Sequence, residues 1–212
     1  MRQPSRALWI GLFVIAIFAT LGAKYYPSFP GDVWLERGVQ SLLPGNPNWA
    51  EVVSKTAEFP WFLLILALIL ALSWVIGGWR AGLLSILSFA GMWALGNLLG
   101  PIIARPRPSP ELVHVFRPLS GYSFPSLFAL RYAATFGFLA VLAIVKTSGL
   151  RRCVMVSLSC ALLILGWIAR VALAAHWPSD VIISYYWGVL WAVFLIRFTL
   201  FKQPARRLRI RL

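Results

Sequence analysis

The chain has few charged residues: Asp, Glu, Lys and Arg make up 12% of its 212 residues, whereas hydrophobic residues make up 60%. A soluble domain carries about 25% charged residues. The polar surface is therefore too small for a water-soluble globule, and the composition excludes a soluble enzyme, a disordered chain and a collagen-like fibre. The sequence also lacks internal repeats and low-complexity tracts, so one domain is expected over residues 1–212.

Cysteine, histidine and acidic residues are scarce. Cys153 and Cys160 stand two turns apart on an expected helix, about 10 Å along its axis, which is too far for a disulfide. We interpret them as filling the core. The two histidines and six acidic residues show no metal-ligand spacing beyond a single His–Asp pair, so neither a metal nor another cofactor is expected.

Apolar runs long enough to cross a bilayer occur six times, since a spanning helix takes about 20 mostly apolar residues. They cover residues 7–23, 60–79, 82–103, 126–145, 154–175 and 181–200. The sequence therefore predicts an all-α, polytopic membrane helical bundle with a core at about residues 60–200. The first run also resembles a signal peptide, but its length favours a helix that is retained.

The charges predict the orientation of this bundle. The net charge is +14, and all six acidic residues fall on the side opposite to the N-terminus: Asp32, Glu36, Glu51, Glu58, Glu111 and Asp180. The positive-inside rule places both termini in the cytoplasm, and we expect a bacterial inner membrane with a periplasmic outer face. The basic tail, residues 201–212, is interpreted as an anchor for anionic lipid headgroups, so no nucleic-acid partner is expected.

The outer connection at residues 24–59 is long and is predicted to be an interfacial segment. Trp34, Leu35, Val39 and Leu42 recur in it at helical spacing, between polar residues. This pattern predicts an amphipathic helix at the membrane surface. Two interpretations stay open: a lid that packs on the bundle, and a surface that admits a lipid headgroup.

Basic residues gather in the second outer loop, where the positive-inside rule disfavours them. The loop contains Arg105, Arg107 and Arg117. Arginine is suited to bidentate phosphate binding, although these residues are also suited to contacts with lipid phosphates of the outer leaflet.

The third outer connection also carries polar residues with chemical capability. Arg170 falls inside an apolar run, where a charge is costly and indicates a functional site or a side chain that reaches the interface. His176 is followed four residues later by Asp180, and a nearby carboxylate is a common means of fixing an imidazole tautomer. Asp180 is equally suited to cap the last span. The clustering of charges at one face argues against a transporter, whose charges line the midplane.

Three separated segments resemble the signature of the phosphatidic acid phosphatase type 2 superfamily, which includes vanadium haloperoxidases. The first part of that signature, Lys, six residues and Arg-Pro, matches at Arg107-Pro108. The second, Pro-Ser-Gly-His, matches in Ser123-Phe124-Pro125-Ser126. The third, Ser-Arg, five residues, His, three residues and Asp, matches at Arg170, His176 and Asp180 with both spacings intact.

The resemblance implies a membrane phosphatase that hydrolyses a lipid phosphate or polyprenyl diphosphate at the outer face through a phosphohistidine. His176 is then the nucleophile and Asp180 the residue that orients it. Arg107, Ser126 and Arg170 bind the phosphoryl group, with Ser126 at the N-terminus of the fourth span, where free N–H groups favour an anion.

The departures from the signature put catalysis in doubt. Gly100 stands where the signature has Lys, Leu127-Phe128 where it has Gly-His, and Ala169 where it has Ser. The general acid is therefore absent, and such a group contributes about 10²–10⁴-fold. A diphosphate suffers less from this loss, because its leaving group is a weaker base. The alternative function is an inactive family member that binds headgroups or serves as a structural subunit beside membrane protein partners.

Replacements for the lost groups are conceivable at three positions. His114 is placed to supply a proton, although an exposed loop histidine is the simpler interpretation. Arg105 or Arg131 is placed to supply the missing charge, although Arg131 is also suited to pair with a polar group such as Asn97.

Overall fold

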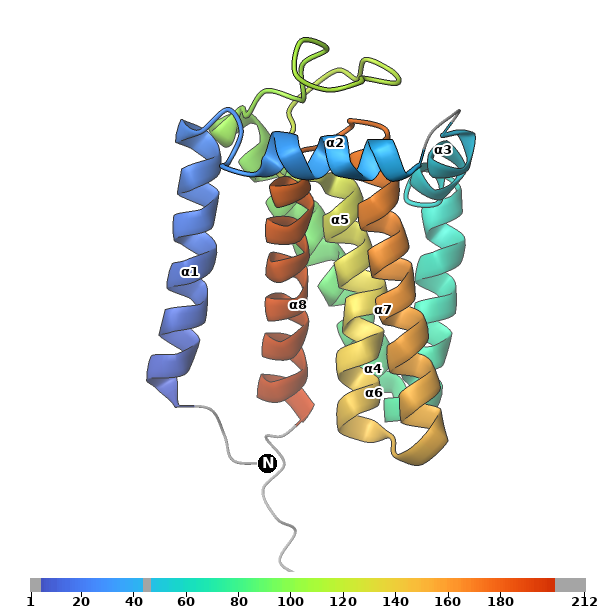
Figure 1. Cartoon of the computed structure of the whole chain (residues 1–212). Helices are drawn as coiled ribbons and strands as arrows, with labels where there is room; N and C mark the ends of the chain where they lie inside the picture. The colour runs from blue at the N-terminus through green and yellow to red at the C-terminus, as the bar shows by residue number, and fades with distance from the viewer. Residues whose placement is uncertain (1–4, 44–46, 201–212) are drawn as a thin grey trace, which may run out of the picture.

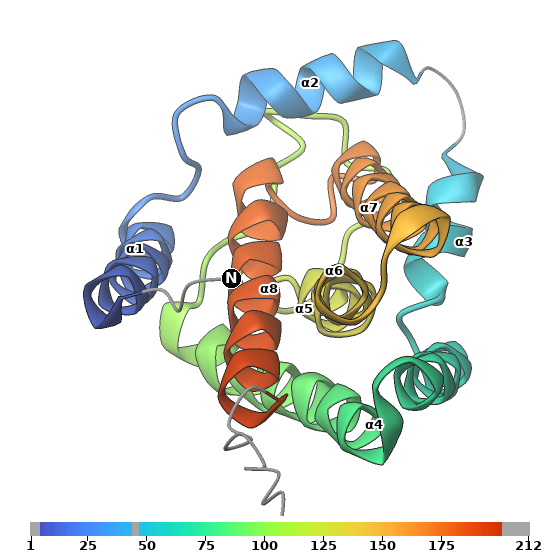
Figure 2. The same cartoon turned by 90° about the horizontal axis from the view of Figure 1, so that it is seen from below.

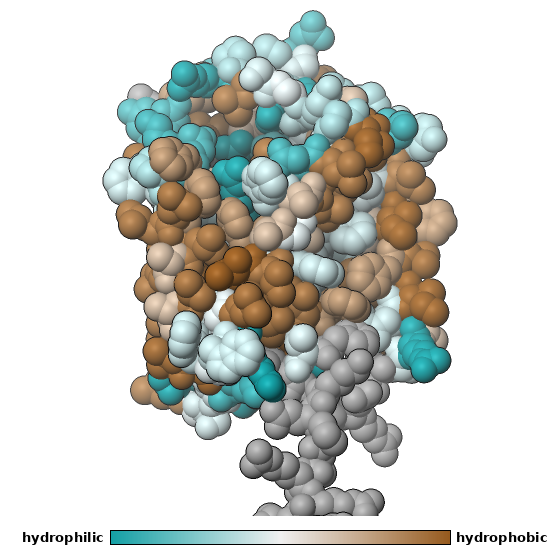
Figure 3. Space-filling view, turned by 180° about the vertical axis from the view of Figure 1, so that it is seen from behind, coloured by the Kyte–Doolittle hydropathy of each residue, from teal (hydrophilic) through white to brown (hydrophobic). Residues whose placement is uncertain are grey.

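The structure is a computed structural model that describes residues 5–43 and 47–200, and this part of the chain is helical and contains no strand. Five helical segments are long and apolar enough to cross a membrane. They are α1 (Arg6–Tyr25), α4 (Trp61–Ile103), α5 to α6 (Leu127–Lys146), α7 (Gly149–Ala172) and α8 (Pro178–Leu200). These segments stand side by side in Figure 1, and Figure 3 shows a hydrophobic belt between more hydrophilic ends. The chain is an integral membrane protein of the all-α class, as predicted.

Helix α4 contains a break that explains its length. Its 43 residues would span about 65 Å as one straight helix, roughly twice the thickness of the bilayer core. Gly78 interrupts it with φ 75° and ψ −177°, a conformation that glycine adopts at low cost. Phe62 and Phe89 stack with ring centroids 5.5 Å apart, so the two halves run back along each other. Each half has the length of one predicted span, and the break precedes the predicted loop at Arg80 by two residues.

The fourth predicted span lies at the centre of the bundle. It consists of α5 (Leu127–Tyr132), a π-helical turn η1 (Ala133–Gly137) and α6 (Phe138–Lys146). Figure 2 shows it surrounded by α4, α7 and α8. Gly188 of α8 permits the close approach, because a Cβ there would lie 2.4 Å from the Cβ of Ala133. The N-terminus of α5 therefore lies at the centre of one end of the bundle, and the candidate site is located there.

Two short helices cover one end of the bundle: α2 (Asp32–Leu42) and α3 (Asn48–Lys55). Helix α2 lies across the ends of α7 and α8 in Figure 1. The predicted amphipathic helix is therefore present, but its polar side faces the protein: Asp32 and Glu36 are buried, whereas Trp34 is 77% exposed. Burial raises the pKa of Glu36 to about 9, so its carboxyl group is protonated at neutral pH. Helix α2 thus packs on the bundle as a lid and leaves apolar side chains outward.

Other expectations from the sequence have mixed outcomes. Helix α7 ends at Ala172, three residues earlier than predicted. The interpretation of Cys153 and Cys160 as core residues is wrong, because both are free and exposed on α7. The predicted basic tail, residues 201–212, lies outside the described residues.

Candidate active site

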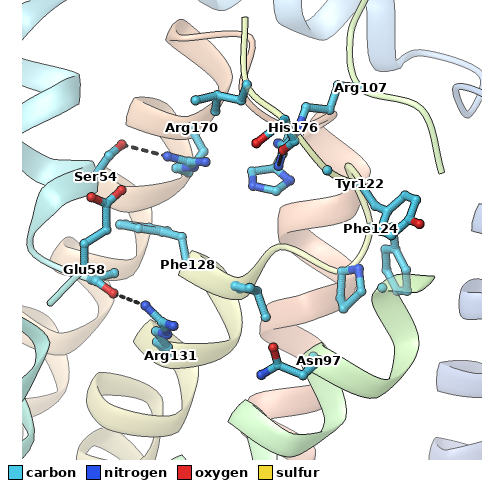
Figure 4. A pocket seen from close by; sticks show the side chains of 18 of the residues that line it. Ser54, Glu58, Asn97, Arg107, Tyr122, Phe124, Phe128, Arg131, Arg170 and His176 are labelled. Atoms are coloured by element: carbon cyan, nitrogen blue, oxygen red, sulfur yellow. Dashed lines mark hydrogen bonds between the residues drawn. The ribbon is translucent and has the colours of Figure 1, made fainter. Parts of the chain in front are cut away.

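A cavity of about 430 Å³ lies at the end of the bundle that carries α2 and α3. Its wall combines the turn after α3, the end of α4, the loop before α5, the first turns of α5 and the end of α7. Figure 4 shows its polar side chains. The charged and imidazole groups in this wall are Arg107, Arg131, Arg170, Glu58 and His176.

The cavity brings together the three residues on which the sequence prediction depends. Arg107 lies in the loop after α4, Arg170 in the last turn of α7 and His176 in the connection to α8, and all three line the wall. Arg107 is more than 60 residues away from the other two in the sequence, and it meets them because α4 and α7 end, and α8 begins, at the same level. The predicted convergence of these side chains is therefore present in the fold.

The environment of His176 favours a neutral imidazole. Its Nδ1 lies 2.5 Å from the carbonyl oxygen of Ser123. Because a carbonyl only accepts hydrogen bonds, Nδ1 must carry the proton, and Nε2 keeps its lone pair in the neutral tautomer. Burial lowers the pKa of His176 well below its usual value, and the positive charges of Arg170 and Arg107 lower it further.

Asp180 does not contact His176 directly. Its Oδ1 accepts a hydrogen bond from Arg105, and its Oδ2 accepts one from the Ser123 hydroxyl at 2.5 Å. The Ser123 hydroxyl also accepts a hydrogen bond from the Trp177 backbone N–H at 3.4 Å. Asp180 thus holds Ser123, and the carbonyl of Ser123 holds the imidazole. The orienting role that the resemblance implies for Asp180 runs through Ser123 in this structure.

Arg105 belongs to a buried ion-pair network outside the cavity. Its guanidinium group is fully buried, pairs with Asp180 and lies 3.2 Å from Asp32 of α2. It also donates a hydrogen bond to the Tyr26 carbonyl oxygen at 3.0 Å and lies over the Phe29 ring. Two carboxylates compensate its charge, so Arg105 does not supply the missing cation.

The guanidinium groups of Arg107 and Arg170 are held in different ways. Arg107 donates hydrogen bonds to the carbonyl oxygens of Ser120, at 3.2 and 3.3 Å, and Ala175. Burial lowers its pKa, although arginine stays protonated at neutral pH. Arg170 is 8% exposed, donates to the Ser54 hydroxyl at 3.0 Å and keeps a buried Nε–H without a partner. Neither guanidinium forms an ion pair within the described residues, which leaves both available to an anion.

Ser126 has a structural position. It is the N-cap of α5, as predicted, and its hydroxyl accepts a hydrogen bond from the Ala129 backbone N–H at 3.3 Å. Its own N–H donates to the Ser184 hydroxyl. Ser126 is fully buried and is not among the residues that line the cavity. Ser126 is therefore not part of the cavity wall, where its predicted contact with phosphate would be made.

Residues 62–204, most of the chain, match the model of the PAP2 superfamily. The chain belongs to this superfamily. A solved structure with the same fold is that of the transmembrane PAP2-type phosphatidylglycerolphosphate phosphatase from Bacillus subtilis. It is 21% identical, with a TM-score of 0.72 over 93% of this chain and 98% of that chain. No curated protein sequence shows a significant match. The PAP2 family match supports a membrane lipid phosphatase, and the solved structure shows the shared fold.

Three of the four positions that depart from the PAP2 signature line the cavity as well: Gly100, Leu127 and Phe128. Leu127 and Phe128 pack into spaces left by Gly96 and Gly166, because a Cβ on either glycine would lie within 3.0 Å of them. The Phe128 ring is 5% exposed and lies under the Arg170 guanidinium group, 5.4 Å from its carbon. An aromatic ring thus fills the place where the signature has the general acid.

His114 and Arg131, which the sequence suggested as replacements for the missing PAP2 groups, differ in their position relative to the cavity. His114 is exposed, and its backbone is bound to Gln40 of α2, away from the cavity. Arg131 lines the cavity, donates to the Ala57 carbonyl oxygen and keeps a buried Nε–H without a partner. Of the positions considered, only Arg131 therefore adds positive charge to the site.

Ser54, Glu58 and Ser123 belong to the site or its support but were not predicted from the sequence. Ser54 and Glu58 precede the segment that matches the PAP2 model, so no signature draws attention to them. Ser123 stands at the edge of the second part of the signature, and its role depends on contacts with residues more than 50 positions away. Within residues 5–43 and 47–200, no cluster of three His, Cys, Asp or Glu side chains suits a metal ion.

Proposed function

We propose that the protein is a membrane phosphatase that hydrolyses a lipid phosphate or a polyprenyl diphosphate through a phosphohistidine at His176. The observation that carries this proposal is the neutral imidazole of His176, with Nδ1 bound to a carbonyl, in a cavity that also contains Arg107 and Arg170. A nucleophile beside cations without anionic partners suits attack on a phosphoryl group.

The first chemical step forms the covalent intermediate. Nε2 of His176 attacks phosphorus, the bond to the leaving oxygen breaks, and that oxygen keeps the electron pair. Arg107 and Arg170 stabilise the charge on the other phosphoryl oxygens, in the manner of preorganised donors. Ser123 keeps Nδ1–H in place, and Asp180 keeps Ser123 in place.

The second step hydrolyses the intermediate. Water attacks phosphorus, the P–N bond breaks with its electron pair returning to Nε2, and inorganic phosphate leaves while one proton of the water is released. The imidazole returns to its neutral form. Because Phe128 is not an acid, the leaving group of the first step must depart as a stable anion or take its proton from elsewhere, which favours a diphosphate over phosphatidic acid.

The site is proposed to face the periplasm of a bacterial inner membrane. All six acidic residues lie in α2, in or just after α3, in the loop before α5, or in the first turn of α8, at the end that carries the cavity. The charge pattern assigns Arg80, Lys146 and Arg151 to the cytoplasm, and these residues lie at the opposite end of the bundle. The positive-inside rule orients this charge separation.

The test is phosphate release by purified protein in detergent. Phosphatidic acid, phosphatidylglycerol phosphate and undecaprenyl diphosphate are supplied separately, with His176→Ala as the control. Release by the wild type that the substitution abolishes supports the proposal. Absence of release from all three lipids would reject it and favour the inactive, headgroup-binding alternative.

A further inference from the structure

The cavity contains one carboxylate among its lining side chains, that of Glu58. Glu58 lies in the turn after α3, two residues before Pro60, the N-cap of α4. In the view of Figure 4, Glu58 and Ser54 stand at one side of the cavity, while His176 and Arg107 stand across from them. The Glu58 carboxylate therefore shares this cavity with the imidazole that would carry a phosphoryl group.

The charge of Glu58 is placed near two guanidinium groups without being bound by either. It interacts electrostatically with Arg170 and with Arg131. Within the described part of the chain the only ion pairs are those of Arg105, so the Glu58 carboxylate forms none within 4.0 Å. Nor does its side chain take part in a hydrogen bond among the described residues. The carboxylate is therefore free to accept a proton.

Two further properties suit Glu58 to proton transfer. Its side chain is exposed, so a proton that it accepts can pass to water. It also lines the same wall as Phe128, which occupies the position of the lost histidine. A carboxylate from outside the matched segment thus lines the same cavity as Phe128, where the signature has an acid–base group.

We propose that Glu58 is the general base of the second chemical step, a role that rests on the phosphohistidine mechanism proposed above. Its carboxylate takes one proton from the attacking water while the oxygen of that water bonds to phosphorus. The P–N bond breaks, its electron pair returns to Nε2 of His176, and inorganic phosphate is released. Glu58 then passes the proton to bulk water, which restores the carboxylate.

A purely structural role for Glu58 has a different consequence. If the carboxylate only balances the charges of Arg170 and Arg131, its removal disturbs phosphate binding and affects both chemical steps alike. A general base acts on the second step alone. The two roles are therefore separated by measuring formation and breakdown of the phosphohistidine individually.

The experiment uses full-length protein in detergent and undecaprenyl diphosphate labelled with ³²P at the terminal phosphate. Rapid quenching gives the label on protein, and phosphate release gives turnover. Glu58→Gln should form labelled protein at the wild-type rate, accumulate it to nearly one per chain, and turn over about 10²–10⁴-fold more slowly. Glu51→Gln is the matched control, because Glu51 lies on α3 and does not line the cavity.

A second variant keeps the test independent of the amide. Glu58→Ala should regain turnover when sodium formate is added, whereas Glu51→Ala should show no response. If Glu58→Gln turns over at the wild-type rate, or if protein labelling and phosphate release fall by the same factor, Glu58 is not the general base. Either result leaves the phosphohistidine mechanism itself standing. If the wild type neither releases phosphate nor becomes labelled, the phosphohistidine mechanism fails first, and the proposal for Glu58 falls with it.

Discussion

Replacement of Ser123 by alanine is expected to lower catalytic rate through a residue that does not line the cavity. The substitution removes the hydroxyl that donates to the buried Asp180 carboxylate at 2.5 Å, but it keeps the carbonyl that holds His176. A hydrogen bond to a charged group contributes about 1.5–3 kcal/mol. If that energy maintains the position of the carbonyl in the transition state, its loss lowers kcat by about 10- to 150-fold.

The same substitution should also reduce stability, since it leaves one oxygen of a fully buried carboxylate without a partner. A loss of about 1.5–3 kcal/mol corresponds to a decrease of roughly 3–12 °C in the thermal midpoint for a chain of this size. The assay combines thermal unfolding in detergent with kcat for the best lipid substrate, measured well below the midpoint of the variant.

Ser85→Ala is the matched control, because Ser85 is fully buried in α4 and donates a hydrogen bond to the Gly82 carbonyl oxygen at 2.7 Å, away from the cavity. It should lose stability without losing kcat. A normal kcat in Ser123→Ala, together with a lowered thermal midpoint, would show that the Ser123 hydroxyl is structural and would refute the link from Asp180 to His176.

Three other variants test separate parts of the site. The double variant Phe128→His with Leu127→Gly should raise phosphatidic acid hydrolysis by up to about 10²-fold if the added imidazole serves as the acid. No gain in hydrolysis would contradict that role. Arg107→Gln should raise the pKa of His176, so the acidic limb of its pH–rate profile should move to higher pH; an unmoved limb would exclude this electrostatic effect. Because burial depresses that pKa in the folded state, protonation of His176 should also cost stability as pH falls below about 6.5. Arg105→Met should destabilise the fold by about 3–5 kcal/mol in thermal or denaturant unfolding, because two carboxylates lose their cation, and a neutral effect would mean that they are protonated.

The spans, and the proximity of Arg170 to His176, were predictable from the sequence because both depend on local patterns. Apolar runs report directly on helices that cross a bilayer, and the break at Gly78 displaced one boundary by only two residues. The spacing between Arg170, His176 and Asp180 is likewise local. This spacing places Arg170 at the end of α7 and Asp180 at the start of α8, with His176 in the short connection between them.

Contacts between distant segments account for what the sequence did not predict. The polar side of α2 turns inward because Asp32 meets Arg105, 73 residues away. The Ser126 hydroxyl accepts a hydrogen bond from the Ala129 N–H in the first turn of α5. Because the first N–H groups of a helix have no partner within the helix, this bond competes with phosphate binding by Ser126. Glu58 enters the cavity only because the turn after α3 lies against the end of α7, and no spacing in the sequence reports that proximity.

The ion pair between α2 and Arg105 means that the signature is not a self-sufficient unit. A shortened protein that started at residue 62 would retain every matched position, yet Arg105 would face one carboxylate instead of two. A change at α2 would then reach the His176 imidazole through the contacts of Arg105, Asp180 and Ser123. Deletion of the first 61 residues should therefore disable the site while leaving the segment that matches the PAP2 model whole.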